Sequence, residues 1–154
     1  MQTVLLFLSL YLNMTGDHCN DLKEIRSMFQ QGVQNKRELN IMIDLCKVSN
    51  CKKTIPYFAA ATMRKSEFSV SPIEKLKNFN KGKKILETYI AKCPNDIEAK
   101  YIRWLTQTKA PRFLRYNQNT REDYQFIIEN IAKSNVEKNY QKVILDHLQN
   151  LENE

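Results

Sequence analysis

The stretch Ser71–Cys93, SPIEKLKNFNKGKKILETYIAKC, predicts one long α-helix. Its first residues form a capping box, in which Ser71 caps the helix, Pro72 takes the first helical position and Glu74 reaches back. Pro94 then ends the helix. The apolar residues in between recur at helical spacing and predict one buried face: Ile73, Leu76, Phe79, Leu86, Tyr89 and Ile90.

Gly82 lies inside this helix, on its apolar side. A glycine within a helix costs about 1 kcal/mol relative to alanine, so its presence needs a compensating reason. We expect that a second helix crosses closely at this point. The alanine run 59–61, in an earlier segment, predicts another place where helices approach each other.

Similar start signals recur along the chain, and each satisfies backbone N–H groups of a first helical turn. Apolar spacing also predicts earlier helices over 21–31, closed by Gly32, over 36–47, and from near residue 54. In the last helix His147 lies beside the apolar face, which predicts an interfacial histidine. The further start signals are Asn95 with Glu98, Thr120 with Asp123, and Ser134 with Glu137.

The glycine content narrows the fold class. Only 3 of 154 residues are glycine, whereas the tight turns of β-sandwiches and barrels need many. Without a glycine cluster, a phosphate-cradling loop is excluded. Gly82, Leu86 and Pro94 stand at the offsets of a tetratricopeptide repeat (TPR), from which Tyr89 and Lys100 depart. We predict an all-α fold of about seven antiparallel helices stacked as TPR-like helical hairpins.

Residues 79–127 resemble the central part of an uncharacterised family of small helical proteins from Bacteroidetes. The shared elements are the NKGKK run at 80–84, Pro94-Asn95 with Glu98, Arg103 in the next helix, and the loop and helix over 110–127. The resemblance implies an exported or envelope setting. It implies no particular activity.

The N-terminus carries an apolar run, Val4–Leu12. This run is too short to cross a bilayer as a helix, which takes about 20 residues, and its length fits the core of a secretory signal. We therefore expect residues 1–16 to be a signal peptide, residues 17–154 to form a single helical domain, and the protein to be periplasmic or in the cell envelope. The alternative is a buried first helix in a cytoplasmic protein.

The chain contains four cysteines, Cys19, Cys46, Cys51 and Cys93. In an exported protein Cys46 and Cys51 are candidates for a disulfide across a helix turn. The alternative is that both are buried free thiols, which behave as small apolar side chains. The spacing shows no C-x-x-C pair and the two histidines are far apart, so we expect no metal site and no cofactor.

The stretch 109–126, KAPRFLRYNQNTREDYQF, has two interpretations. In one it fills the end of the helix stack: Phe113, Leu114 and Tyr116 turn inward, and Arg112 and Arg115 pair with Glu122 and Asp123. In the other, arginines and aromatic rings form a recognition patch for bases or phosphates. That candidate binding surface consists of Arg112, Phe113, Arg115, Tyr116 and Arg121, extended by Lys77, Lys81 and Lys84 on the preceding long helix.

Functional motifs are scarce. The sequence contains no G-x-S-x-G, no H-E-x-x-H and no recognisable Cys–His pairing. We therefore expect a non-enzymatic scaffold or adaptor that binds another protein. A net charge of +7, from 24 basic and 17 acidic residues, keeps open a basic anion or nucleic-acid binding protein. A third alternative is an enzyme whose site is assembled from residues scattered along the chain.

Overall fold

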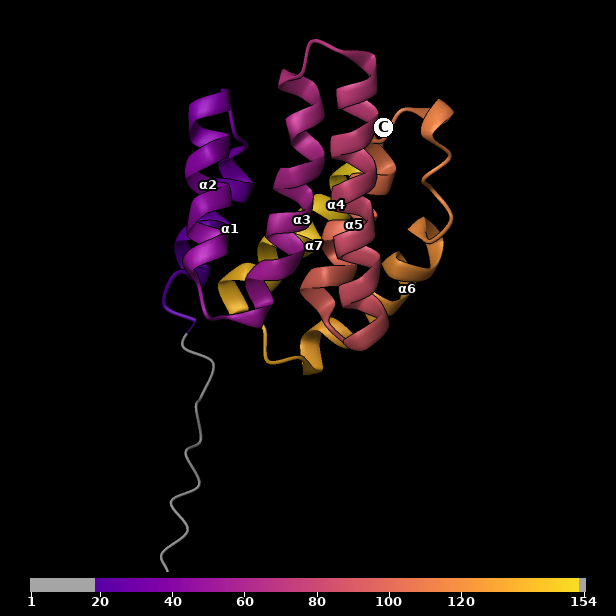
Figure 1. Ribbon diagram of the computed structural model, residues 1–154. Helices are drawn as coiled ribbons and strands as arrows, with labels where there is room; N and C mark the ends of the chain where they lie inside the picture. Colours follow the sequence, from indigo (N-terminus) through magenta and orange to yellow (C-terminus); the bar gives the residue numbers. More distant parts are fainter. Residues whose placement is uncertain (1–18, 153–154) are drawn as a thin grey trace, which may run out of the picture.

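The computed structural model describes residues 19–152 and shows seven α-helices among them (Figure 1). The predicted signal peptide, residues 1–16, lies outside the described residues. Short 3₁₀ turns connect several of the helices: η1 (Lys52–Thr54), η2 (Lys65–Phe68), η3 (Arg112–Leu114) and η4 (Ile131–Lys133). The helices are α1 (Leu22–Gln31), α2 (Lys36–Val48), α3 (Ile55–Arg64), α4 (Pro72–Lys92), α5 (Ile97–Lys109), α6 (Thr120–Asn130) and α7 (Lys138–Glu152).

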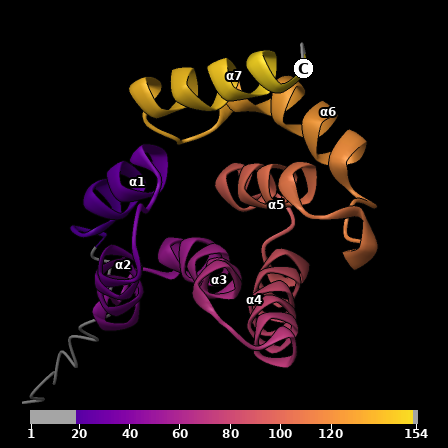
Figure 2. The same ribbon diagram turned by 90° about the horizontal axis from the view of Figure 1, so that it is seen from above.

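The helices pack against their neighbours in the order of the chain. Viewed from above, α2, α3 and α4 form a row, α1 and α5 lie behind it, and α6 and α7 close the far side (Figure 2). The predicted all-α class is confirmed, and every predicted helix has a counterpart. The prediction of a single domain stays a prediction.

The close approach predicted at Gly82 is confirmed, and so is the one predicted at the alanine run. Gly82 of α4 is buried against α3. A Cβ atom at this position would lie 2.5 Å from the carbonyl oxygen of Ala59 and 2.7 Å from the backbone nitrogen of Met63. Both are backbone atoms, so the spacing of the two helices depends on the missing side chain.

Four predicted helix starts need correction. Thr120, predicted to cap α6, is instead its first helical residue, and the Asn119 side chain before it makes no capping hydrogen bond. Pro72 begins α4 as expected, but the Ser71 side chain makes no capping hydrogen bond. The cap of α5 is Asp96 rather than Asn95, and its Oδ1 accepts from the Ala99 N–H at 3.1 Å. The last helix begins at Lys138 rather than directly after Ser134, because Ser134 is extended and residues 134–136 form a bend in place of the predicted first turn.

The helix α5 lies at the centre of the molecule, surrounded by other helices (Figure 2). Its residues from Ile97 to Trp104 are all buried, including three that carry charge: Glu98, Lys100 and Arg103. The sequence IEAKYIRW shows no apolar stripe, because no side of this helix faces solvent.

The candidate disulfide between Cys46 and Cys51 is wrong, and the alternative of two buried free thiols is right for Cys46 but wrong for Cys51. Cys51 forms a disulfide with Cys19, which precedes α1, across a Cα–Cα distance of 4.8 Å. Packing of α1 against α3 brings Cys19 and Cys51 together over a sequence separation of 32. The spacing of cysteines along the chain does not indicate such a pairing. Cys46 and Cys93 are free. Burial raises the pKa of the Cys46 thiol to about 12, which makes it unreactive.

The disulfide is consistent with an oxidising, extracytoplasmic setting. None of the helices described between residues 19 and 152 combines the length and the apolar character needed to cross a bilayer.

Candidate binding groove

A groove opens at the end of the bundle where α3 is joined to α4, uppermost in Figure 1. It encloses about 1250 Å³ and is lined by the last turns of α1, α3, α5 and α7, the first turns of α4, and the segments η2 (Lys65–Phe68) and η3 (Arg112–Leu114). Its inner wall is mainly apolar: Phe29, Met63, Phe79, Leu105, Leu114 and Leu151.

Two large apolar side chains stand on the rim of the groove. Leu76 of α4 is 49% exposed and Phe113 of η3 is 80% exposed. Ile73, on the first turn of α4, is 81% exposed. The apolar stripe predicted for α4 is wrong about the burial of its first two positions, since Ile73 and Leu76 face solvent, and it is right for Phe79 and the later members, which are buried.

The position of Gly82 explains this exposure. Because Gly82 lies against Ala59 and Met63, near the end of α3, the α4 residues before Phe79 extend past the last turn of α3. The period of a helix indicates which side is apolar, but not where its neighbour ends.

The lining also contains a histidine that connects the groove with the interior. His147 of α7 lines the groove, and its Nδ1 is hydrogen-bonded to the hydroxyl of buried Tyr101. Burial and the neighbouring ammonium of Lys109 lower the pKa of His147, against the opposing influence of Asp146. The predicted interfacial role is confirmed.

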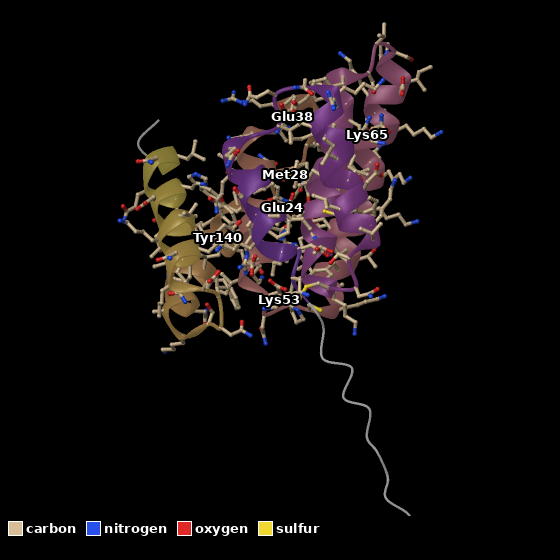
Figure 3. The ribbon with its side chains drawn as sticks, turned by 90° about the vertical axis from the view of Figure 1, so that its left-hand side faces the viewer. Glu24, Met28, Glu38, Lys53, Lys65 and Tyr140 are labelled. Carbon is tan, nitrogen blue, oxygen red and sulfur yellow. A yellow bond between two sulfur atoms is a disulfide. The ribbon has the colours of Figure 1, made fainter. Side chains whose placement is uncertain are left out.

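Below the groove, a buried polar cluster joins α1, α3, α5 and α7. Arg26 donates through Nε to Glu98 at 2.9 Å, and a second guanidinium nitrogen also contacts that carboxylate. Tyr57 donates to the same Glu98 at 2.6 Å, and its oxygen lies 2.8 Å from the Tyr140 hydroxyl. In Figure 3 Tyr140 lies on the side of α7 that faces α1, where the Arg26 guanidinium stacks 4.7 Å from its ring centre.

This first cluster is closed to ligands. Burial is the largest cause that raises the pKa of Tyr57, followed by the Glu98 carboxylate, so the Tyr57 hydroxyl keeps its proton and donates it. Tyr57 has one proton and gives it to Glu98, so the shared contact is donated by Tyr140. The remaining nitrogen of Arg26, Nη1, lies 3.6 Å from the carboxylate of Glu137 outside the cluster, so the buried polar atoms of the cluster all have protein partners.

A second buried cluster joins α4, α5 and α6. Asp123 accepts from Arg103 Nε at 2.6 Å and Nη2 at 2.7 Å, and lies 3.4 Å from Lys100 Nζ. Arg103 also donates from Nη1 to Glu87 at 2.9 Å, and Tyr116 donates to Glu87 at 2.6 Å. The expected pairing of Asp123 with Arg112 or Arg115 is therefore wrong: Asp123 points inward, toward α5.

These clusters are satisfied internally. Within residues 19–152, no buried side-chain nitrogen or oxygen lacks a hydrogen-bond partner. In the same part of the chain, no three metal-ligating side chains gather closely enough to hold a metal ion. The prediction that the protein is not an enzyme stays a prediction.

The sequence-predicted surface divides into an exposed and a buried part. Tyr116 is buried: its ring meets Phe79 edge-on with centroids 5.8 Å apart, and Lys83 Nζ lies 4.7 Å above it. Leu114 is half-buried, so the filling interpretation holds for these two residues and is wrong for Phe113. The remaining members are exposed: Lys77, Lys81, Lys84, Arg112, Arg115 and Arg121.

Sequence reasoning missed the groove and both clusters. Glu98 and Asp123 were expected as first-turn capping residues, and each instead closes a buried ion pair. The one available signal was the helix of residues 97–104, in which charges interrupt every apolar side.

Comparison of the chain with family models, curated proteins and solved structures gives no match. The structure shows a small all-helical protein, and the resemblance to the Bacteroidetes family stays a prediction.

Proposed function

We propose that this protein is a non-enzymatic helical adaptor that binds an apolar segment of another protein in the groove. The observation that carries the proposal is the exposure of Leu76 and Phe113, 49% and 80%, on the rim of a concave apolar surface. Clustered apolar side chains around a concavity are typical of interaction sites, whereas isolated ones on a convex surface are common and carry no such meaning.

We also propose that α3, α4 and α5 are stacked as TPR-like antiparallel helices. The groove lies at the end of these helices rather than on the concave face that such stacks present to a ligand, so the binding proposal rests on the groove rim. The Cys19–Cys51 disulfide supports the accompanying proposal that the adaptor is exported and works in the periplasm or cell envelope.

The test is a peptide selection against the immobilised protein, followed by affinity measurements on the selected peptides. The double variant Leu76→Ser with Phe113→Ser removes both rim anchors, and we expect it to weaken binding by at least about tenfold. Val48→Ser is the matched control, because Val48 is 74% exposed but lies on α2, outside the groove lining. Equal binding by the wild type and the double variant would contradict the proposal.

A second candidate, the anion or nucleic-acid binding protein, rests on the lysines of α4. Lys77, Lys81 and Lys84 are all exposed on this helix, and Arg112, Arg115 and Arg121 are exposed as well. Such a surface binds through counterion release, so its affinity falls steeply with salt. Titration of mixed-sequence DNA and RNA at two salt concentrations tests it, and absent or salt-independent binding excludes this candidate.

A further inference from the structure

The charged side chains on the groove lining indicate which charge a bound partner segment should carry. Of the described residues that line it, Glu67 is the one carboxylate. Arg64 holds that carboxylate through Nε at 3.3 Å and Nη2 at 3.1 Å, and it also donates to the Val33 carbonyl at 2.9 Å. These two charges therefore neutralise each other.

Within the described part of the chain, two lysines on the lining have no carboxylate partner, so they determine the net charge of the groove. Lys75 on α4 and Lys109 at the end of α5 are both exposed, and among the described residues neither forms an ion pair. The ammonium of Lys109 is near enough to His147 to lower the pKa of that histidine, which places its charge over the groove. Any occupant thus meets an apolar floor flanked by two positive charges.

The floor also favours one backbone conformation of the occupant. An extended peptide needs partners for its own N–H and C=O groups, and helix side chains that are mainly apolar offer few. A helix satisfies these groups internally and presents only side chains. Its size is suitable, since ten residues of helix, about 15 Å long and about 10 Å across, fill about 1200 Å³, close to the 1250 Å³ of the groove.

We infer that the partner segment is an amphipathic helix whose apolar face fills the groove and whose flanking residues are acidic. The inference rests on the proposed adaptor function and adds the conformation and charge of the ligand. Leu76 and Phe113 contact the apolar face, and Lys75 and Lys109 pair with carboxylates beside it. Such rim pairs fix the orientation of the helix and select against basic segments.

The experiment uses fluorescent designed amphipathic helices with one leucine face and either glutamate or lysine flanks, titrated onto the full chain. Two exposed ion pairs change affinity by about 2- to 30-fold, so we expect about tenfold tighter binding of the acidic peptide at low salt. High salt should reduce this preference. The variant Lys75→Glu with Lys109→Glu should reverse it.

The control is Lys77→Glu with Lys84→Glu, which changes the net charge equally on exposed positions outside the groove lining. It should leave the preference unchanged, with circular dichroism confirming that both variants fold. Equal binding of acidic and basic peptides overturns the inference and leaves the adaptor proposal standing. If no designed helix binds, the inference is overturned. If the peptides selected against the immobilised protein also fail to bind, or if loss of Leu76 and Phe113 does not weaken their binding, the adaptor proposal itself fails. Binding to phosphatidylglycerol vesicles without binding to peptides identifies a lipid surface and overturns both.

Discussion

Between α1, α3, α5 and α7 the buried polar side chains are paired with one another, whereas on the groove rim, at the end of these helices, apolar side chains of α4 and η3 are exposed to solvent. Glu98 is 2% exposed and holds both Arg26 and Tyr57. On the groove rim, Leu76 and Phe113 are 49% and 80% exposed. Both regions are built from α1, α3, α5 and α7, but only the groove has exposed apolar side chains that a partner could bind.

The difference indicates how the protein divides its stability from its binding. Burying a charge costs free energy, which a well-placed partner only offsets, so buried ion pairs favour one arrangement of helices over others more than they add stability. The groove rim carries no such network. Changes to the interior should therefore affect unfolding, and changes to the rim should affect binding alone.

The largest effect is expected from Glu98→Ala, which leaves the Arg26 guanidinium buried without its carboxylate. Breaking a buried pair in this way destabilises by about 3–5 kcal/mol, measured as a lower urea midpoint. Glu24→Ala, on exposed α1 surface (Figure 3), is the control and should change stability by less than about 0.5 kcal/mol. Similar midpoints for the two variants would show that the first cluster is not coupled to folding.

Loss of the disulfide comes next. Cys51→Ser opens the loop of sequence separation 32, and a loop of that length corresponds to about 3.5 kcal/mol of chain entropy in the unfolded state. Reducing agent should lower the melting temperature of the wild type and leave that of the variant unchanged. Cys93→Ser, which removes a free thiol, is the control; an equal loss of stability in both variants would contradict the assignment.

Gly82→Ala tests the close approach of α3 and α4. The new methyl group would meet backbone atoms of Ala59 and Met63, and overpacking of this kind costs about 1–3 kcal/mol, more than the gain of about 1 kcal/mol in helix propensity. Adding Met63→Ala relieves the contact with the Met63 side chain but not those with the backbone, so it should not restore the melting temperature. A more stable Gly82→Ala variant would show that the helices can separate at little cost.

The helices could be predicted because their signals are local. Capping residues act within one turn, and apolar periodicity needs only the segment itself, so α1 to α6 begin near their predicted positions, and α1, α2 and α4 also end near theirs. The buried clusters have no local signal. Arg26 and Glu98 are 72 residues apart, and Tyr57 and Tyr140 are 83 apart. Glu98 and Asp123 fit a first-turn role equally well, and only the neighbouring helices decide between that role and an ion pair.

The groove could not be predicted from the sequence for a related reason. Its rim exists because α4 continues past the end of α3, and its lining comes from segments spread from Phe29 to Leu151. The exposed lysines of α4 were foreseeable, since a polar face follows from the apolar one. The filling interpretation placed Phe113 in the interior because of its apolar character, which does not fix the direction of a loop side chain, and the alternative interpretation placed it on the surface, where it lies.

The smallest effect on stability is expected where the two regions meet, at His147. Its pKa is lowered from its ordinary value of 6.5 in the folded protein. Between the lowered value and 6.5 the unfolded chain therefore binds more protons, and stability falls as the pH drops through this window. His147→Gln should flatten the pH dependence of the urea midpoint there, and His18→Gln serves as the control because the chain has 2 histidines.

An acidic helix in the groove would instead favour the charged imidazole of His147, so binding of the acidic peptide in the same pH range should be accompanied by proton uptake. Unchanged proton uptake in the glutamine variant would show that the linkage arises elsewhere in the protein.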